Sequence, residues 1–284
     1  MAEYANLRRL VETSWVEDQL ENPKVRIVEV DVDTSAFEEG HLPGSIAWDW
    51  TRDLCDQATR DILSQRDFES LMRRSGIDND TTVVLYGDNH NWFAAWALWQ
   101  MVIYGHEKVC LMNGGRDLWL SEGRPLSLEV VEPKASAYTA KEAEGSHRAF
   151  FDDTLAGAMA GTIHLVDVRS PAEFTGELLA PPGLPETCQR GGHIPGAANV
   201  PWNKVCDDSG RFLSRAELEK LYGDAGVDGS RPVVAYCRIG ERSSHTWFVL
   251  KELLGFSDVR NYDGSWTEWG NRVRVPVERG PAKR

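Results

Sequence analysis

Short apolar runs alternate with amphipathic segments along most of the chain. Three such runs, residues 163–168, 232–236 and 259–262, have the length and the β-branched or aromatic content of strands. Helical patterns separate them, and the resulting βαβα order is typical of a parallel sheet with helices on its faces. The pattern therefore predicts an α/β fold.

Helix starts are marked by polar caps. Ser214 is followed three residues later by Glu217, a spacing at which the two side chains cap the first turn of a helix reciprocally. Leu218 and Leu221 then fall on one face of the predicted helix. We therefore expect a helix that begins at Ser214 and packs this face on the sheet.

The chain repeats itself. Four short blocks of the first half recur in the same order in the second half, and the paired blocks are 30–33 with 166–169, 40–45 with 192–197, 83–86 with 233–236, and 113–119 with 263–269. From Ser64 to Trp119 the correspondence holds without a gap. Chance does not produce four ordered matches, so the chain is a tandem duplication.

The duplication predicts two α/β domains, each a parallel sheet flanked by helices. We place the first domain in residues 1–123 and the second in residues 151–284. Residues 124–150 are rich in Glu, Ala and Ser and include two prolines. We expect this stretch to be a solvated linker.

Composition narrows the possible partners. With 284 residues and 42% hydrophobic content the chain can bury two cores of ordinary size. Its formal net charge of −13 argues against nucleic acid or an anionic membrane as the partner. Residues 1–22 lack the apolar run of a secretion signal, and no later stretch approaches membrane-spanning length. We therefore expect a cytoplasmic protein.

The chain has five cysteines, an odd number, and no two of them show Cys-x-x-Cys spacing. This pattern argues against a structural zinc site and a disulfide framework, so no metal is expected. An intracellular cysteine is by default a small buried apolar residue. Local evidence is therefore needed before any of them is considered reactive: Cys55, Cys110, Cys188, Cys206 and Cys237.

Cys237 has such evidence. It directly follows an apolar run, and an amphipathic helix is predicted to begin near Ser243, so the cysteine starts a short loop that leads into a helix N-terminus. Unpaired N–H groups and the positive end of the helix dipole stabilise an anion there. Arg238 and Arg242 add cations that favour the thiolate. Gly240 permits the tight backbone path that such a cradle requires.

The candidate site is this loop, with Cys237 as its nucleophile. The other members are expected to bind the substrate: Arg238, Ile239, Gly240, Glu241, Arg242 and Ser243. No comparable cationic segment surrounds the other four cysteines, which we interpret as inert. In the first copy Gly87 stands at the cysteine position and Asp88 follows it. That copy is therefore expected to be catalytically inactive.

These blocks resemble the rhodanese family, and in particular its tandem-domain thiosulfate sulfurtransferases. The resemblance runs from about Ser14 to Val277. Residues 37–44 are similar to the family's amino-terminal signature, residues 259–269 match its carboxy-terminal signature, and residues 237–242 are similar to its active-site loop. The resemblance implies two tandem rhodanese-like domains, of which the second is the active one.

The resemblance also implies a two-step reaction. The Cys237 thiolate attacks the outer sulfur of thiosulfate, releases sulfite and becomes a persulfide, and cyanide or a cellular thiol then takes the sulfur. The implied partners are a small anionic sulfur donor and a cyanide or thiol acceptor, and a protein acceptor is an alternative. No cofactor is implied, because the loop amides and cations can stabilise the sulfur anion.

Three departures from the family pattern bear on the sulfur donor. Ile239 stands where thiosulfate enzymes often have a second cation and mercaptopyruvate enzymes a serine, and Glu241 adds a negative charge found in neither pattern. Glu173 takes the place where many tandem members have an arginine for the carboxylate of mercaptopyruvate. The loss of this arginine and of the serine at Ile239 favours thiosulfate and leaves 3-mercaptopyruvate as the alternative donor.

Two other functions remain open. A cysteine phosphatase also places a cysteine before an anion cradle, but it needs arginine as the sixth residue after the cysteine. Ser243 stands at that position here, and Arg242 comes one position early. A relay that passes persulfide to a protein partner would use the same Cys237 loop.

Several polar residues outside the loop have simpler interpretations. His41 and His193 each follow a glycine and precede a Pro-Gly turn, and we expect their rings to fix these turns by hydrogen bonds. The sequence leaves three roles open, those of Arg169, Arg190 and His245.

Overall fold

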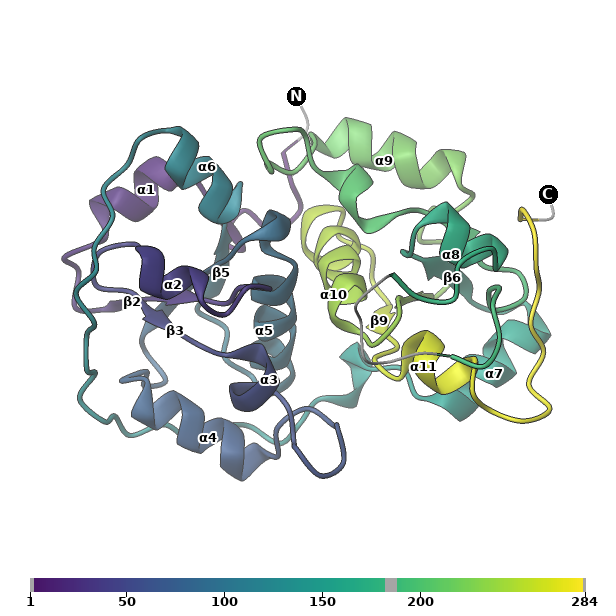
Figure 1. The fold of residues 1–284 in the computed structure, drawn as a ribbon, viewed down its shortest axis with the longest axis horizontal. Coiled ribbons are helices and arrows are strands. Elements are labelled where there is room, and N and C mark those ends of the chain that lie inside the picture. Colours follow the sequence, from purple (N-terminus) through teal and green to yellow (C-terminus); the bar gives the residue numbers. More distant parts are fainter. Residues whose placement is uncertain (1–2, 182–187, 283–284) are drawn as a thin grey trace. The chain divides into compact units, whose positions relative to one another are not determined.

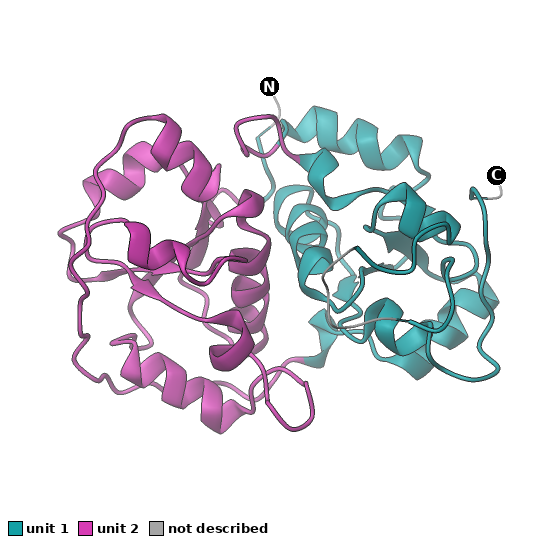
Figure 2. Cartoon of the chain, in the orientation of Figure 1, with its two compact units in different colours: residues 1–5, 145–205, 213–284 teal, residues 6–144, 206–212 magenta. Residues whose placement is uncertain are grey.

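The computed structural model describes residues 3–181 and 188–282. Its internal contacts divide the chain into two compact units, which Figure 2 shows in different colours. The first-copy unit consists of residues 6–144 and 206–212, and the second-copy unit of residues 1–5, 145–205 and 213–284. The described residues of each unit form one β-sheet.

The sheet of the first-copy unit is parallel, with the strand order β1-β5-β4-β2-β3. Its strands are β1 (Leu10–Val11), β2 (Val25–Glu29), β3 (Ile46–Ala47), β4 (Thr82–Tyr86) and β5 (Val109–Met112). In the central pair Glu29 lies opposite Tyr86. Since β4 and β5 are almost entirely apolar and buried, this sheet is covered on both faces.

Helices connect these parallel strands (Figure 1). They are α1 (Thr13–Asp18), α2 (Ala36–Glu39), α3 (Trp50–Asp53), α4 (Gln65–Arg74), the 3-10 turn η1 (Asn89–Asn91), α5 (Trp92–Ile103) and α6 (Gly115–Ser121). Ser64 caps α4, because its Oγ accepts the N–H of Asp67 at 3.2 Å. The helix α5 is buried on nearly all sides and is correspondingly apolar, with Trp99 fully buried.

The sheet of the second-copy unit is also parallel, with the order β7-β6-β8-β9. Its strands are β6 (His164–Asp167), β7 (Ala198–Asn199), β8 (Val233–Tyr236) and β9 (Val259–Asn261). Three of them lie within the runs 163–168, 232–236 and 259–262, so the strands predicted there are confirmed. The fold is therefore α/β in both units, as the βαβα pattern indicated.

Helices again surround this sheet, and α10 lies beside β9 (Figure 1). The helical elements are η2 (Gly145–His147), α7 (Phe151–Ala160), α8 (Pro171–Thr175), η3 (Trp202–Val205), α9 (Arg215–Asp224), α10 (Glu241–Phe248), the π-helical turn η4 (Val249–Leu253) and α11 (Ser265–Trp269). The predicted reciprocal cap of Ser214 and Glu217 is present at the start of α9. Ser170 and Glu173 form a second such cap at α8, which we did not predict.

Most of residues 124–144 are exposed, as their composition suggested, but the contacts of this stretch assign it to one of the two units. These residues belong to the first-copy unit, where Ser127 pairs with His41 in an antiparallel bridge. Tyr138 is 1% exposed and its ring packs edge-on against Phe68. One aromatic ring and main-chain hydrogen bonds thus fix a polar segment, and the boundary between the units falls after residue 144.

In both units the strand that precedes the loop is tied to a turn that recurs in the two copies. Tyr236 Oη accepts the N–H of Ile194 at 3.1 Å, as Tyr86 Oη accepts the N–H of Leu42 at 3.1 Å. Both rings are fully buried. The carboxyl end of β8, where Cys237 follows, is therefore held at a fixed position in its unit.

Candidate active site

The loop after β8 is shorter than the sequence suggested. The helix α10 begins at Glu241, two residues before the predicted start near Ser243, and Gly240 precedes it with φ of 101°. A side chain at Gly240 would be strained at this φ and would come within 2.6 Å of the Asp263 main chain. The glycine thus lets the chain turn directly into the helix, so that Glu241 and Arg242 belong to the first turn of α10.

The Cys237 sulfur lies against the start of this helix. The N–H of Gly240 donates to Cys237 Sγ at 3.1 Å. The cysteine side chain is fully buried. A backbone donor at a helix N-terminus stabilises a sulfur anion, which supports the interpretation of Cys237 as a nucleophile.

Arg242 forms an ion pair with Glu173 of α8 near the thiol. Glu173 Oε1 and Oε2 accept hydrogen bonds from Arg242 Nη2 at 3.2 Å and Nη1 at 3.4 Å. Burial by itself would lower the pKa of Arg242, but a Cys237 thiolate and the Glu173 carboxylate raise it above its ordinary value. Burial would likewise raise the pKa of Glu173, but Arg242 holds it below its usual range.

The Arg238 main chain is fixed from α11. Its carbonyl accepts the N–H of Thr267 at 3.0 Å and the Thr267 hydroxyl at 3.0 Å. The Arg238 charge acts on Cys188, whose pKa is raised mainly by burial. Ile239 and Glu241 are 7% and 5% exposed, so the whole loop is enclosed.

Ser243, predicted to contact the substrate, has its hydroxyl directed at protein acceptors in this structure. Its Oγ lies 2.6 Å from Asn261 Oδ1 and 3.1 Å from Gly240 O. Asn261 Nδ2 also donates to Gly240 O at 2.9 Å. Ser243 therefore helps to hold Gly240, and its contact with a substrate stays a prediction.

Ser265 and Asn261 were not singled out from the sequence. Ser265 Oγ accepts the N–H of Cys237 at 3.1 Å, and the N–H of Trp266 donates to Cys237 O at 3.1 Å. Both Ser265 and Asn261 lie in the stretch 259–269, which resembled a family signature. That resemblance was the available signal, but it did not say which side chains face the loop.

The structure assigns contacts to the arginines whose roles were open. Arg169 is 1% exposed, pairs with Asp167, and stacks its guanidinium over Trp266 at 4.5 Å. Burial would lower the pKa of Arg169, but the Asp167 carboxylate raises it. Arg190 donates to four main-chain carbonyls, those of Trp269, Gly270, Arg272 and Val275. Both arginines therefore stabilise the fold.

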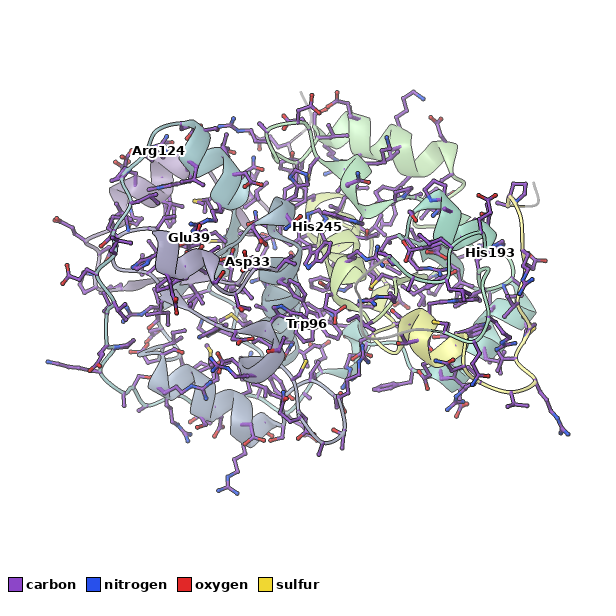
Figure 3. The ribbon with its side chains drawn as sticks, viewed as in Figure 1. Asp33, Glu39, Trp96, Arg124, His193 and His245 are labelled. Atoms are coloured by element: carbon purple, nitrogen blue, oxygen red, sulfur yellow. The ribbon has the colours of Figure 1, made fainter. Side chains whose placement is uncertain are left out.

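Two of the three histidines, His41 and His193, fix turns of the chain, and the third, His245, is buried. His193 stacks on Phe174 with 3.6 Å between ring centroids, and its Nδ1 lies 2.9 Å from Phe174 O. His41 makes the same two contacts with Phe37, which confirms the predicted turn-fixing role. His245, labelled on α10 in Figure 3, is fully buried and meets the Trp202 ring edge-on at 5.8 Å.

The first copy has a different loop after β4. The N–H of Gly87 donates to Asn91 Oδ1 at 2.9 Å. Asp88 accepts the N–H groups of Val32 and Asp33 at 2.7 and 3.1 Å. A carboxylate and an amide thus fill the place where the second copy has a thiol and arginines.

Burial raises the pKa of three of the other cysteines, Cys110, Cys188 and Cys206. Burial raises the pKa of Cys110 and of Cys206 to about 12. Cys188 is 3% exposed and its Sγ lies 3.4 Å from Trp266 O. A thiol that stays protonated is a poor nucleophile, so these environments favour the inert interpretation.

Two broader features can be stated for residues 3–181 and 188–282. Every helix there is too short or too polar to traverse a lipid bilayer. No cluster of three or more His, Cys, Asp or Glu side chains in these ranges is arranged to bind a metal ion.

Comparison with known proteins gives two matches to one family model and a set of close relatives. The model of the rhodanese-like domain matches residues 12–122 and 151–272. A Mycolicibacterium smegmatis protein named "Putative thiosulfate sulfurtransferase" is 55% identical over 272 residues, which cover 95% of this chain and 98% of that protein. A Haloferax volcanii protein of the same name is 54% identical over 276 residues, with coverage of 95% and 96%.

Another similar relative has a different name. The "Sulfur carrier protein TtuD" of Thermus thermophilus is 51% identical over 281 residues, which cover 98% of this chain and 99% of that protein.

Solved structures of EanB have a similar fold. The wild-type EanB structure has a TM-score of 0.86 and 25% identity, and the match covers 99% of this chain and 71% of that one. The anaerobic ergothioneine biosynthesis enzyme from Chlorobium limicola, in complex with trimethyl histidine, matches with a TM-score of 0.86 and 25% identity. This match covers 99% of this chain and 72% of that one. A further EanB variant carries a cysteine persulfide together with ergothioneine, again with a TM-score of 0.86 and 25% identity over 99% and 72%.

Proposed function

This chain belongs to the rhodanese family of sulfurtransferases, and on that premise we propose that Cys237 takes the outer sulfur of thiosulfate and passes it on as a persulfide. In the first step the Cys237 thiolate attacks that sulfur, the S–S bond of thiosulfate breaks, and sulfite leaves with the bonding electron pair. In the second step an acceptor anion, cyanide or a thiolate, attacks the persulfide sulfur and restores the Cys237 thiolate. No oxidant or reductant is consumed.

The observation that carries this proposal is the hydrogen bond from the Gly240 N–H to Cys237 Sγ at 3.1 Å. It places the sulfur at the N-terminus of α10, where backbone donors favour an anion on the sulfur in both states of the cycle. Arg242 adds a positive charge that interacts with a Cys237 thiolate. A thiolate held in this way is the form that attacks thiosulfate.

The pair of Glu173 and Arg242 supports thiosulfate over 3-mercaptopyruvate as the donor. Glu173 is 1% exposed and already forms an ion pair with the Arg242 guanidinium. The carboxylate of 3-mercaptopyruvate would therefore meet Glu173 at the place where many tandem members have an arginine to bind it. Ile239 adds no hydroxyl for such a donor. We expect a larger kcat/KM for thiosulfate than for 3-mercaptopyruvate.

A persulfide relay to a protein acceptor is the second candidate, favoured by the 51% identity to a relative named as a sulfur carrier. Relay uses the same Cys237 persulfide and differs in the acceptor. The loaded protein can be mixed with cyanide or with a candidate protein thiol, and the loss of sulfur from Cys237 followed over time. A faster loss to the protein thiol would favour the relay.

The deciding experiment is intact mass after brief exposure to thiosulfate, with the site mapped by peptide. We expect one added sulfur atom on Cys237 and none in Cys237→Ser. Because Cys237 is fully buried in this structure, the experiment also tests whether a small anion reaches the sulfur. Absence of added sulfur in the parent protein would contradict thiosulfate as the donor, and turnover of an aryl phosphate would then favour a cysteine phosphatase.

A further inference from the structure

Ser265 has an unusual backbone conformation for a residue with a side chain. Its φ is +50°, in the left-handed region, and it is fully buried. This conformation costs a non-glycine residue conformational free energy, which other contacts must offset. The Ser265 hydroxyl provides them, because its Oγ accepts the N–H of Cys237 at 3.1 Å and donates to Tyr262 O at 2.6 Å.

The first copy has a glycine at the corresponding position. Gly115 adopts φ of +59°, and a Cβ there would lie 2.5 Å from Gly87 O and 2.6 Å from Asn91 Oδ1. In that copy the N–H at the cysteine position, that of Gly87, is bound by Asn91. The two copies therefore satisfy the same N–H group with side chains from different segments, Asn91 in one and Ser265 in the other.

Because of this difference, the acceptor for this N–H group comes from the loop itself in the first copy and from outside the loop in the second copy. Asn91 belongs to η1, in the loop itself, whereas Ser265 is the first residue of α11. With Ser265 as acceptor, the second copy needs no amide side chain from its own loop to bind the cysteine N–H. The N–H of Trp266 also donates to Cys237 O at 3.1 Å, so α11 holds both main-chain polar groups of Cys237.

We propose that Ser265 is a positioning residue for Cys237. By binding the Cys237 N–H it fixes the backbone from which Sγ meets the Gly240 N–H, and it keeps the thiolate oriented toward the helix N-terminus. The inference rests on the proposed function insofar as Cys237 is the nucleophile. Its effect on the thiolate, however, can be measured without any sulfur donor.

The test uses Ser265→Gly and Ser265→Ala in the full-length protein. Glycine accepts the observed φ without strain, so the first variant removes the hydroxyl while relieving the backbone. The rate of Cys237 alkylation by iodoacetamide is measured against pH by peptide mass, and sulfur loading from thiosulfate is measured by intact mass. We expect the alkylation midpoint to move about one pH unit upward, which is a tenfold smaller thiolate fraction at a pH below the midpoint. We expect loading to be about tenfold slower.

A matched control is Thr154→Val, which removes another buried hydroxyl. Thr154 of α7 is 1% exposed, and its Oγ1 donates to the carbonyl of the N-cap residue Phe150 at 2.8 Å. This variant should keep the parent alkylation profile and loading rate. The same change in Thr154→Val as in the Ser265 variants would attribute the effect to general destabilisation and overturn the proposal.

The remaining outcomes also decide. Parent-like alkylation profiles in both Ser265 variants would overturn the proposal. If Ser265→Ala does not fold, Ser265→Gly gives the answer alone. If the parent protein takes no sulfur from thiosulfate, the proposed donor fails, whereas the alkylation profiles still report on Ser265.

Discussion

The Glu173 carboxylate and the Arg242 guanidinium are held together in the second-copy unit by two hydrogen bonds, with side chains that are 1% and 12% exposed. Glu173 also accepts the N–H and the hydroxyl of Ser170 at the start of α8. The cation beside the candidate thiol is therefore positioned by a helix cap. The position of the Arg242 charge near Cys237 therefore depends on Glu173 as well as on Arg242 itself.

Replacing Arg242 with alanine should slow sulfur loading and destabilise the protein. The Glu173 charge would be left buried without its partner, which costs about 3 kcal/mol. The anion would also lose a cation, and we expect about tenfold slower loading from thiosulfate, equivalent to about 1.4 kcal/mol. Thermal unfolding and single-turnover loading by intact mass measure the two effects.

The double variant Glu173→Gln with Arg242→Ala separates these effects. Glutamine can keep the Ser170 cap but carries no charge, so the melting temperature should recover toward that of the parent while loading stays slow. Recovery of loading together with stability would show that Arg242 acts through folding and not on the sulfur.

Cys237→Ser should abolish sulfur transfer, because serine gives no thiolate to attack thiosulfate. Serine variants of the other four cysteines should each retain transfer, because the proposed reaction uses only the Cys237 thiolate: Cys55, Cys110, Cys188 and Cys206. Thiocyanate formation from thiosulfate and cyanide checks all five. Thiocyanate made by Cys237→Ser at the parent rate would refute the mechanism.

The pKa of Asp31 predicts that the stability of the first-copy unit depends on pH. Burial, with Glu29 and Asp88 nearby, raises the pKa of Asp31 to about 9. Its unfolded pKa is about 3.9, so between these values the folded state keeps a proton that the unfolded chain has released. The free energy of unfolding should therefore fall as pH rises from about 4 to about 9, by at most about 1.4 kcal/mol per pH unit.

Asp31→Asn should flatten this dependence and stabilise the protein at pH 8 relative to the parent. An asparagine Oδ1 can still accept the Asp88 N–H, which donates to Asp31 Oδ1 at 2.7 Å. Asp33→Asn is the control, because Asp33 is exposed in the same segment. Urea unfolding at pH 5 and pH 8 gives the free energy of unfolding at each pH. An equal change in this free energy between the two pH values for the parent and Asp31→Asn would contradict the assignment.

Gly87→Cys should not convert the first copy into a second active site. A Cβ at Gly87 would lie 2.1 Å from Val30 O, a clash with main chain, and we expect destabilisation of about 2 kcal/mol. The introduced thiol would also adjoin Asp88 instead of an arginine. Made in a Cys237→Ser background, the variant is expected to take up no sulfur.

The control for this clash is Gly223→Ala, because a Cβ there meets nothing within 4 Å. That substitution lies in α9 and should leave the melting temperature unchanged or raise it slightly. Sulfur uptake at residue 87 would mean that the missing thiol alone keeps the first copy inactive.

The predictions that rest on local sequence pattern were confirmed where interactions between residues close in sequence determine the structure. The strands β6, β8 and β9 lie within the predicted runs, and the cap of Ser214 and Glu217 is present. The helix after Cys237 began two residues early, because Gly240 adopts a φ that ends the loop at once. The sequence predicted only that Gly240 permits a tight backbone path, because the φ that it adopts depends on the residues that pack around it.

The two buried guanidinium groups of the repeat could not be related from the sequence. Arg169 Nη2 donates to Gly192 O at 2.7 Å, and Arg116 Nη2 donates to Gly40 O at 2.6 Å. Gly40 and Gly192 correspond in the repeat, but Arg169 follows β6 and Arg116 belongs to α6. Equivalent places in the two units are thus filled from different segments, which no alignment of the two copies indicates.

The amino-acid sequence by itself determined the duplication, the α/β pattern of each copy, and the cysteine at the end of a buried strand. These follow from hydrophobic periodicity, caps and repeated blocks, which act over a few residues. The tertiary structure alone decided that Ser265 binds the Cys237 N–H, that Glu173 holds Arg242, and that residues 124–144 pack on the first-copy unit. Such partners are far apart along the chain, and a buried polar group accepts whichever donor the packing brings near it.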